Sequence, residues 1–106
     1  MVTEGLPAVL VVGAGGHARV CIEALTDTGY LVVGCVSSDG DGVPGLPCPV
    51  VGRDDDLVAV AAELSVRHVF VAIGDNAARS AASRRADAAG LTPVNAISRF
   101  AMLSPG

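Results

Sequence analysis

The feature that most constrains the fold is an apolar run that passes directly into closely spaced glycines. Residues 11–20 read VVGAGGHARV, and the apolar run begins at Ala8. After the glycines, and before Gly29, apolar residues recur at the spacing of one helix face: Ala18, Cys21, Ile22 and Leu25. The pattern predicts a buried strand, a tight turn at Gly13 and an amphipathic helix that ends near Gly29.

Strands and helices alternate along the rest of the chain. Further apolar runs predict strands at residues 30–36, 49–51, 68–73 and 92–97. Residues 37–49 (SSDGDGVPGLPCP) are rich in Gly and Pro without a helical period, which indicates a crossover loop. Asp54 is expected to cap a helix, and Asn76 to Ala89 form an Ala-rich helix. The first of these helices has the following apolar face: Leu57, Val60, Ala61 and Leu64.

This alternation predicts an α/β fold. We expect one small Rossmann-like domain over residues 1–106, with a parallel sheet of about five strands in the order 3-2-1-4-5 and helices on both faces. Hydrophobic residues make up 51% of the chain but aromatic residues only 3%. The core must therefore consist of Val, Leu, Ile and Ala, which suits strands that are buried on both faces.

The composition also excludes several classes of protein. The net charge is −4, and scattered arginines form no basic stripe, so nucleic-acid binding is not expected. No apolar run approaches a membrane span, and the first residues lack the pattern of a signal peptide. Cys21, Cys35 and Cys48 lack the spacing of metal ligands, which favours reduced thiols and no metal. The chain is predicted to be cytoplasmic.

The topology locates a candidate site. In such sheets ligands bind beyond the carboxyl ends of the strands where the strand order reverses, here between the loops GAGGH and GDN. Gly13, Gly15 and Ala18 fit the pattern G-x-G-x-x-A, which brings backbone N–H groups and a helix dipole to an anion. The alternative is a turn that only packs the helix close to the sheet.

The residues after the second strand bear on which anion binds. A dinucleotide fold usually places an acid there, about 20 residues beyond the glycines, to hold the adenosine ribose. Ser37 and Ser38 occupy that place, and Asp39, which follows, can either serve the ribose or form an Asx turn. This weakens the case for NAD without excluding it.

Several segments together resemble one family. In order they are VVGAGGHARV, VVGCV, GLPCPVVGRDDDL, VFVAIGDN, GLTPVNAIS and AMLSP. They resemble the N-terminal domain of the bacterial sugar O-/N-acyltransferases related to the sialic acid O-acetyltransferases and the UDP-4-amino-sugar N-acetyltransferases. The resemblance implies a domain that binds a nucleotide sugar, commonly UDP-linked. It also implies a left-handed β-helix after Gly106, which would bind acetyl-CoA and carry the catalytic histidine.

The resemblance assigns the site residues position by position. The phosphate loop of the family corresponds to Gly13, Gly15, Gly16 and His17, and its loop beside the nucleotide corresponds to Gly74, Asp75 and Asn76. A basic position of the family corresponds to Arg19. The positions after the second strand correspond to Ser37, Ser38 and Asp39. Two departures stand out. Ser37 and Ser38 replace an acidic pair that often contacts the nucleoside, and Ser98-Arg99 replaces the His-Pro that often precedes the β-helix.

Each of these residues also has a purely structural interpretation. His17 can donate to a phosphate or simply pack one turn from Cys21, and Asp75 and Asn76 can cap a helix. The segment RDDD at residues 53–56 can be a solvated helix start. Arg84 and Arg85 are expected to be solvated, and a catalytic role for His68 is disfavoured because this residue opens a strand and follows Arg67.

The sequence thus predicts the nucleotide-sugar-binding domain of an acetyl-CoA-dependent sugar acyltransferase. These 106 residues are expected to hold no catalytic residue and to be inactive alone, as a monomer or weak dimer, whereas the intact protein would be a homotrimer. The alternative is a stand-alone regulatory module that binds NAD(H) or another nucleotide. A nicotinamide reductase ranks third.

Overall fold

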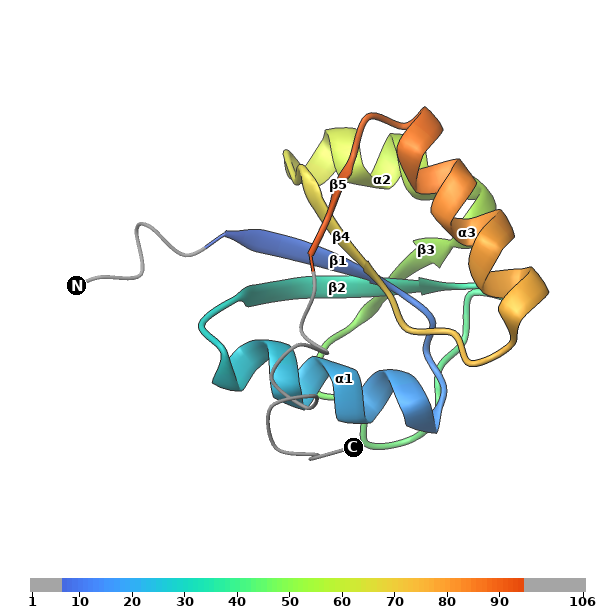
Figure 1. Ribbon diagram of the computed structural model, residues 1–106. Coiled ribbons are helices and arrows are strands. Elements are labelled where there is room, and N and C mark those ends of the chain that lie inside the picture. Colours follow the sequence, from blue (N-terminus) through green and yellow to red (C-terminus); the bar gives the residue numbers. More distant parts are fainter. Residues whose placement is uncertain (1–6, 95–106) are drawn as a thin grey trace, which may run out of the picture.

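Five parallel strands form one sheet, which a computed structural model describes within residues 7–94. The strands are β1 (Ala8–Val12), β2 (Leu31–Ser37), β3 (Val50–Arg53), β4 (His68–Val71) and β5 (Thr92–Pro93). Their order across the sheet is β3-β2-β1-β4-β5, and each neighbouring pair is parallel (Figure 1). The predicted α/β fold class and strand order are confirmed.

Helices cover both faces of the sheet. Helix α1 (Gly16–Asp27) lies on one face, and α2 (Leu57–Leu64) and α3 (Asn76–Ala88) lie together on the other (Figure 1). A single 3-10 turn, η1 (Asp54–Asp56), leads from β3 into α2. The alternation of the central strand explains this layering, because successive side chains of a strand point to opposite faces.

The core is accordingly split by the sheet into two apolar clusters. Val9 and Val11 of β1 pack with the buried face of α1, whereas Leu10 and Val12 pack toward α2 and α3. All four of these side chains are almost fully buried. The strand that enters the glycine turn is therefore the most constrained part of the sheet, and it holds the turn in a fixed place.

Several boundaries differ from the sequence predictions. Asp54 does not cap α2, because the three consecutive aspartates form the tighter turn η1 and the helix begins only at Leu57. Leu64 is 41% exposed rather than part of the core, because α2 ends there and Ser65 turns away with a φ of 57°. Strand β4 ends at Val71, and residues 95–97, where the last predicted strand would end, lie outside the described residues.

Three backbone hydrogen bonds fix the loops at the carboxyl edge of the sheet. The N–H of Gly13 donates to the carbonyl of Val36 at 2.8 Å, which ties the turn after β1 to β2. The N–H of Ala72 donates to the carbonyl of Val12, also at 2.8 Å. The N–H of Val43 donates to the carbonyl of Ala14 at 2.9 Å, so the crossover loop folds back over the glycine turn.

Candidate functional site

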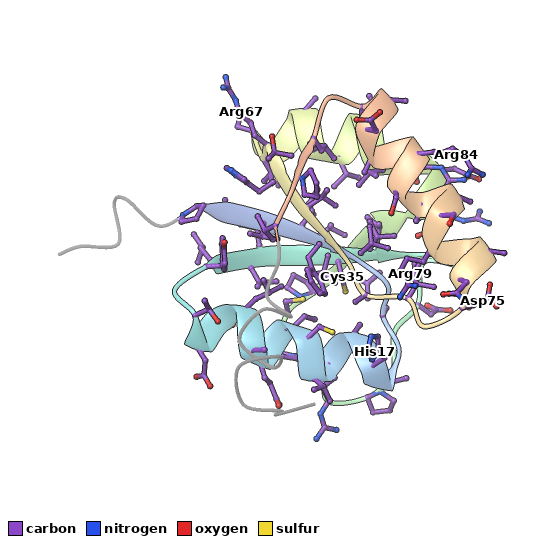
Figure 2. All side chains as sticks on the ribbon, in the orientation of Figure 1. His17, Cys35, Arg67, Asp75, Arg79 and Arg84 are labelled. Carbon is purple, nitrogen blue, oxygen red and sulfur yellow. The ribbon has the colours of Figure 1, made fainter. Side chains whose placement is uncertain are left out.

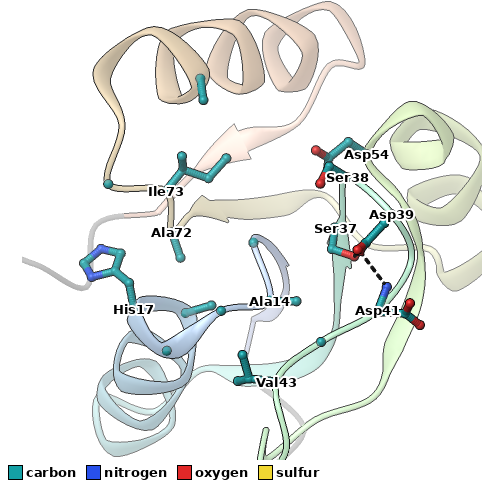
Figure 3. Close-up of a pocket in the computed structure, with 17 residues that line it drawn as sticks. Ala14, His17, Ser37, Ser38, Asp39, Asp41, Val43, Asp54, Ala72 and Ile73 are labelled. Carbon is teal, nitrogen blue, oxygen red and sulfur yellow. Dashed lines mark hydrogen bonds between the residues drawn. The ribbon is translucent and has the colours of Figure 1, made fainter.

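A cavity of about 670 Å³ opens at this carboxyl edge, where the strand order reverses. It is lined by the turn after β1, the first turn of α1, the loop after β2, η1, the loop after β4 and one residue of α3 (Figure 3). The lining residues are Gly13, Ala14, Gly15, Gly16, His17, Ala18, Ser37, Ser38, Asp39, Asp41, Gly42, Val43, Asp54, Ala72, Ile73, Gly74 and Ala78. The fold thus places this cavity between the two loops that the sequence singled out.

The first turn of α1 presents unsatisfied backbone donors to the cavity. Gly15 occupies the N-cap position and offers no side chain to the helix, and the first bond of the helix runs from the N–H of Arg19 to the carbonyl of Gly15 at 3.1 Å. The N–H groups of Gly16, His17 and Ala18 precede that bond and have no acceptor within the helix. A Cβ built on Gly15 or Gly16 would meet nothing within 4 Å. The space beside the first turn of α1 is therefore open, at the positive end of the helix dipole.

The N-terminus of α3, by contrast, is already capped. The N–H of Ala78 donates to the Asp75 carboxylate at 2.8 Å, and the Asn76 side-chain oxygen accepts from the Arg79 guanidinium at 2.6 Å. The capping role of Asp75 is confirmed. Of the three loop residues predicted to lie beside the nucleotide, only Gly74 lines the cavity. Ligand contacts of Asp75 and Asn76 stay predictions.

His17 stands at the mouth of the cavity and also packs on its own helix. Its imidazole lies beside the cavity (Figure 3), and its Nε2 is 3.7 Å from the Cys21 Sγ one turn along. Figure 2 shows His17 at the same end of the molecule as Asp75 and Arg79 of α3. The two interpretations of His17 are therefore compatible with each other.

Arg19 lies outside the cavity. Its side chain is 54% exposed and approaches Glu23, four residues further along α1, at 3.9 Å. It is absent from the cavity lining, although it directly follows Ala18, because its side chain lies on the solvent side of the helix. We therefore leave Arg19 out of the proposed ligand contacts.

The loop after β2 is held by a compact set of hydrogen bonds. The Asp39 carboxylate accepts from the N–H of Asp41 at 3.0 Å and from the hydroxyl of buried Ser37 at 3.2 Å (Figure 3). These two donors, with the Asp41 N–H the stronger, lower the pKa of Asp39. The Asx turn considered for Asp39 is therefore present, and it keeps Ser37, Ser38 and Asp39 on the wall of the cavity.

Asp54, like Asp41, is a charged lining residue that the sequence analysis missed. Its Oδ1 is buried and accepts no hydrogen bond from the part of the chain that the structure describes. Burial raises the pKa of Asp54, and the nearby Arg85 opposes that shift. The expectation of a solvated RDDD segment is wrong for this residue. Its position at the end of β3, at the same edge of the sheet as the glycine turn, is the signal that could have identified it.

Arg85 does not satisfy that carboxylate. Its guanidinium lies 3.8 Å from the Asp55 carboxylate, and its side chain is 39% exposed, so the solvated Arg85 that the sequence predicts also forms an ion pair. The ion pair links α3 to η1 on the outer side of the turn. Arg85 thus acts on Asp54 through its charge and not through a hydrogen bond, and Asp54 remains among the residues that line the cavity.

The cavity has two chemically different ends. Backbone donors of α1 and the small residues Ala72 and Gly74 lie toward the β1 and β4 side. Three carboxylates, those of Asp39, Asp41 and Asp54, lie toward the β2 and β3 side, and no Lys or Arg lines the cavity among residues 7–94. Such a cavity suits an elongated ligand with an anionic part at one end and hydrogen-bond donors at the other.

The remaining reactive groups form no second centre. Cys21 and Cys35 are buried, Cys48 is half-buried, and all three are free thiols. Burial raises the pKa of each, to about 12 for Cys48. Residues 7–94 contain no cluster of three side chains suited to hold a metal, and none of their helices is long and apolar enough to span a membrane.

Comparison with known proteins identifies relatives of this chain. The sequence pattern of the PglD N-terminal domain family matches residues 8–86. The fold matches PerB of Caulobacter crescentus, solved in complex with CoA and GDP-perosamine, with a TM-score of 0.74 and 40% sequence identity. Two variants of the perosamine N-acetyltransferase of the same organism, also in complex with CoA and GDP-perosamine, match with TM-scores of 0.75 and 40% identity. No curated protein sequence matches the chain.

The matched region is a larger share of this chain than of its solved relatives. It spans 84% of this chain but only 41% of each of the three solved proteins. The chain thus spans less than half the length of these relatives.

Proposed function

Because the chain belongs to the PglD N-terminal domain family, we propose that it is the nucleotide-sugar-binding domain of an acetyl-CoA-dependent sugar acyltransferase. The observation that carries the proposal is the uncapped N-terminus of α1, which opens into the cavity under the glycine turn. A diphosphate accepts hydrogen bonds from such backbone donors and is stabilised by the helix dipole. The capped N-terminus of α3 offers no comparable place.

The bound nucleotide sugar would extend in both directions from the diphosphate. Its nucleoside would lie toward Ser37, Ser38 and Asp39, since the carboxylates there can accept from ribose and base donors. Its sugar would lie toward His17 and Gly74, at the side where the cavity is lined by small residues. This orientation keeps the anionic phosphates at the end of the cavity that lacks carboxylates.

The chemical step needs groups beyond these residues. An amine or hydroxyl of the sugar attacks the thioester carbonyl of acetyl-CoA, a base takes the proton, and the thiol of CoA leaves. His17 is the single imidazole that lines the cavity in the described chain, and no carboxylate or serine pairs with it. We propose that acetyl-CoA and the catalytic base belong to a β-helix domain, that the intact protein is a cytoplasmic homotrimer, and that this domain alone is a monomer or weak dimer.

Uracil and guanine are the two candidate nucleobases of the bound nucleotide sugar. The family resemblance suggests a UDP-sugar, whereas the three solved relatives were crystallised with GDP-perosamine. An oligophosphate site on backbone donors does not discriminate between them. The residues around the nucleoside would determine which of the two bases binds.

A thiol-release assay tests the proposal. The 106-residue chain should release no CoA from acetyl-CoA with GDP-perosamine or a UDP-4-amino-sugar. A chimera that joins this chain to the remaining part of the Caulobacter crescentus enzyme should release CoA with at least one of them. Turnover by the chain alone would contradict the proposed division of labour, and a folded chimera that binds no nucleotide sugar would contradict the proposed function.

A further inference from the structure

Asp54 has an acceptor that the protein leaves unused. Its Oδ1 is buried without a hydrogen bond from the described residues, while the residue as a whole lines the cavity (Figure 3). An unsatisfied buried acceptor destabilises a fold unless a ligand or water supplies the donor. Arg85, whose charge acts on Asp54, is in contact with Asp55 instead. A turn of the Asp54 side chain toward the cavity would bring this oxygen to a donor of the occupant.

The sheet indicates which part of the occupant would reach Asp54. Neighbouring strands are about 4.8 Å apart, so the end of β3 lies about 10 Å from the end of β1 across the carboxyl edge. The diphosphate at the end of β1 would be followed by the ribose over Ser37 to Asp39 at the end of β2. The next group along the ligand, over η1 at the end of β3, is the base.

We propose that Asp54 recognises guanine, by accepting hydrogen bonds from its N1–H and its exocyclic N2 amino group. The inference rests on the proposed function and names the nucleotide of that same site. Guanine presents these two donors side by side, and a carboxylate offers two parallel acceptors of matching geometry. Uracil presents one N–H between two carbonyl oxygens, so the second carboxylate oxygen would face a carbonyl and be repelled.

Other side chains do not compete for this role. Asp39 is engaged by the Asp41 N–H and the Ser37 hydroxyl, and it lies at the β2 end, where the ribose diol is expected. Asp41 is exposed and lies on the crossover loop that follows β2, not at the end of β3. Asp54 alone combines a place at the end of β3 with a buried oxygen that lacks a donor in the described chain.

The test compares four nucleotides that differ only in the base. The chain is titrated with GDP, with inosine diphosphate, which lacks the N2 amino group, with xanthosine diphosphate, which has a carbonyl there, and with UDP. NMR chemical shifts with ligand up to millimolar concentrations measure weak binding. A bidentate base contact discriminates by about 1–3 kcal/mol, so GDP should bind roughly tenfold to a hundredfold more tightly than the other three.

The variant Asp54→Asn should reverse one of these preferences. An asparagine presents one acceptor and one donor, which match the N1–H and the C2 carbonyl of xanthine, so xanthosine diphosphate should then bind at least as tightly as GDP. A gain of binding for one ligand cannot arise from unfolding. The matched control is Asp55→Asn, whose side chain is 84% exposed and lies outside the cavity, and it should keep the order of the wild type.

The other outcomes separate this inference from the proposed function. If Asp54→Asn weakens all four nucleotides by the same factor, Asp54 contacts the ribose and the guanine assignment is overturned. If GDP and UDP bind equally and the variant changes neither, the assignment is also overturned, although the proposed function stands. If none of the nucleotides binds, the proposed function fails and this inference fails with it.

Discussion

Gly13 and Ala72 are in backbone contact, and this contact joins the two loops that frame the cavity. A Cβ on Gly13 would lie 2.5 Å from the Ala72 carbonyl oxygen, and Gly13 has a φ of +126°. Only glycine tolerates both the close approach and this conformation. The first glycine of the motif is therefore a structural residue, whereas Gly15 and Gly16 border open space.

Replacing Gly13 with alanine should destabilise the fold. The new methyl group would be driven into a carbonyl, and the backbone would be strained as well, so we expect the free energy of unfolding to fall by about 2 kcal/mol or more. Urea denaturation followed by circular dichroism measures the change. Gly16→Ala is the matched control and should shift stability by no more than about 0.5 kcal/mol. An equal loss of unfolding free energy in both variants would contradict the close contact between Gly13 and Ala72.

Replacing Gly15 with valine should abolish nucleotide binding without unfolding the chain. No atom lies within 4 Å of the new Cβ, so the side chain would fill the space that the diphosphate needs. His17→Ala should remove one hydrogen bond and weaken binding by about 1–2 kcal/mol, roughly tenfold. Calorimetry measures both, with Ala59→Val on α2 as a control outside the cavity. Wild-type affinity in Gly15→Val would place the diphosphate elsewhere.

Two aspartates of the cavity should affect stability in opposite directions. Burial raises the pKa of Asp54, so its charged form destabilises the fold, and Asp54→Asn should be more stable than the wild type at pH 7. The Asp41 N–H and the Ser37 hydroxyl lower the pKa of Asp39, so Asp39→Asn should be less stable at pH 7.

The pH dependence of the stability differences between these variants and the wild type tests both predicted directions. The advantage of Asp54→Asn should vanish as pH falls through the raised pKa, above the ordinary carboxyl value of about 3.9. The deficit of Asp39→Asn should persist to lower pH, because the wild type loses its stabilisation only below that value. Urea midpoints between pH 7 and pH 3 report both differences. A deficit in Asp54→Asn at pH 7 would mean that its charge is satisfied in the protein.

Added salt should not weaken nucleotide binding. The charged side chains that line the cavity in the described chain are the carboxylates of Asp39, Asp41 and Asp54, which repel a diphosphate. Raising ionic strength to about 0.15 M shortens the screening length to about 8 Å and reduces this repulsion. Calorimetry at low and physiological salt should show equal or tighter binding at the higher salt. A steep loss of affinity would indicate cationic contacts, and Asp41→Asn should flatten any gain.

The sequence determined much of the fold because its apolar periods are unambiguous. The buried run from Ala8 to Val12 and the helical spacing from Ala18 to Leu25 specify β1 and α1, and the strand order follows from right-handed crossovers. Element ends were less predictable. The three aspartates before α2 fit a helix cap as well as a 3-10 turn, and sequence alone does not decide between them.

The candidate site was predictable where the glycine pattern and the end of the second strand define it. Gly13, Gly15 and Gly16 follow a recognisable pattern, and the structure places them on the cavity wall. Asp54 was missed because its environment depends on the packing of η1 beside β2 and on Arg85, which pairs with Asp55. Such contacts join residues that are remote in sequence, and no local sequence pattern indicates them.

The most direct test of the account is a titration of the isotopically labelled chain with GDP, UDP and NADH, followed by backbone amide NMR. A nucleoside diphosphate should shift the amides of Gly15 to Ala18 and of Ser37 to Asp39, with further shifts at Asp54 for GDP, and NADH should bind more weakly. The account would be contradicted by NADH binding most tightly. It would also be contradicted if the shifts were confined to the separate cavity beside Ser65 and Gly90.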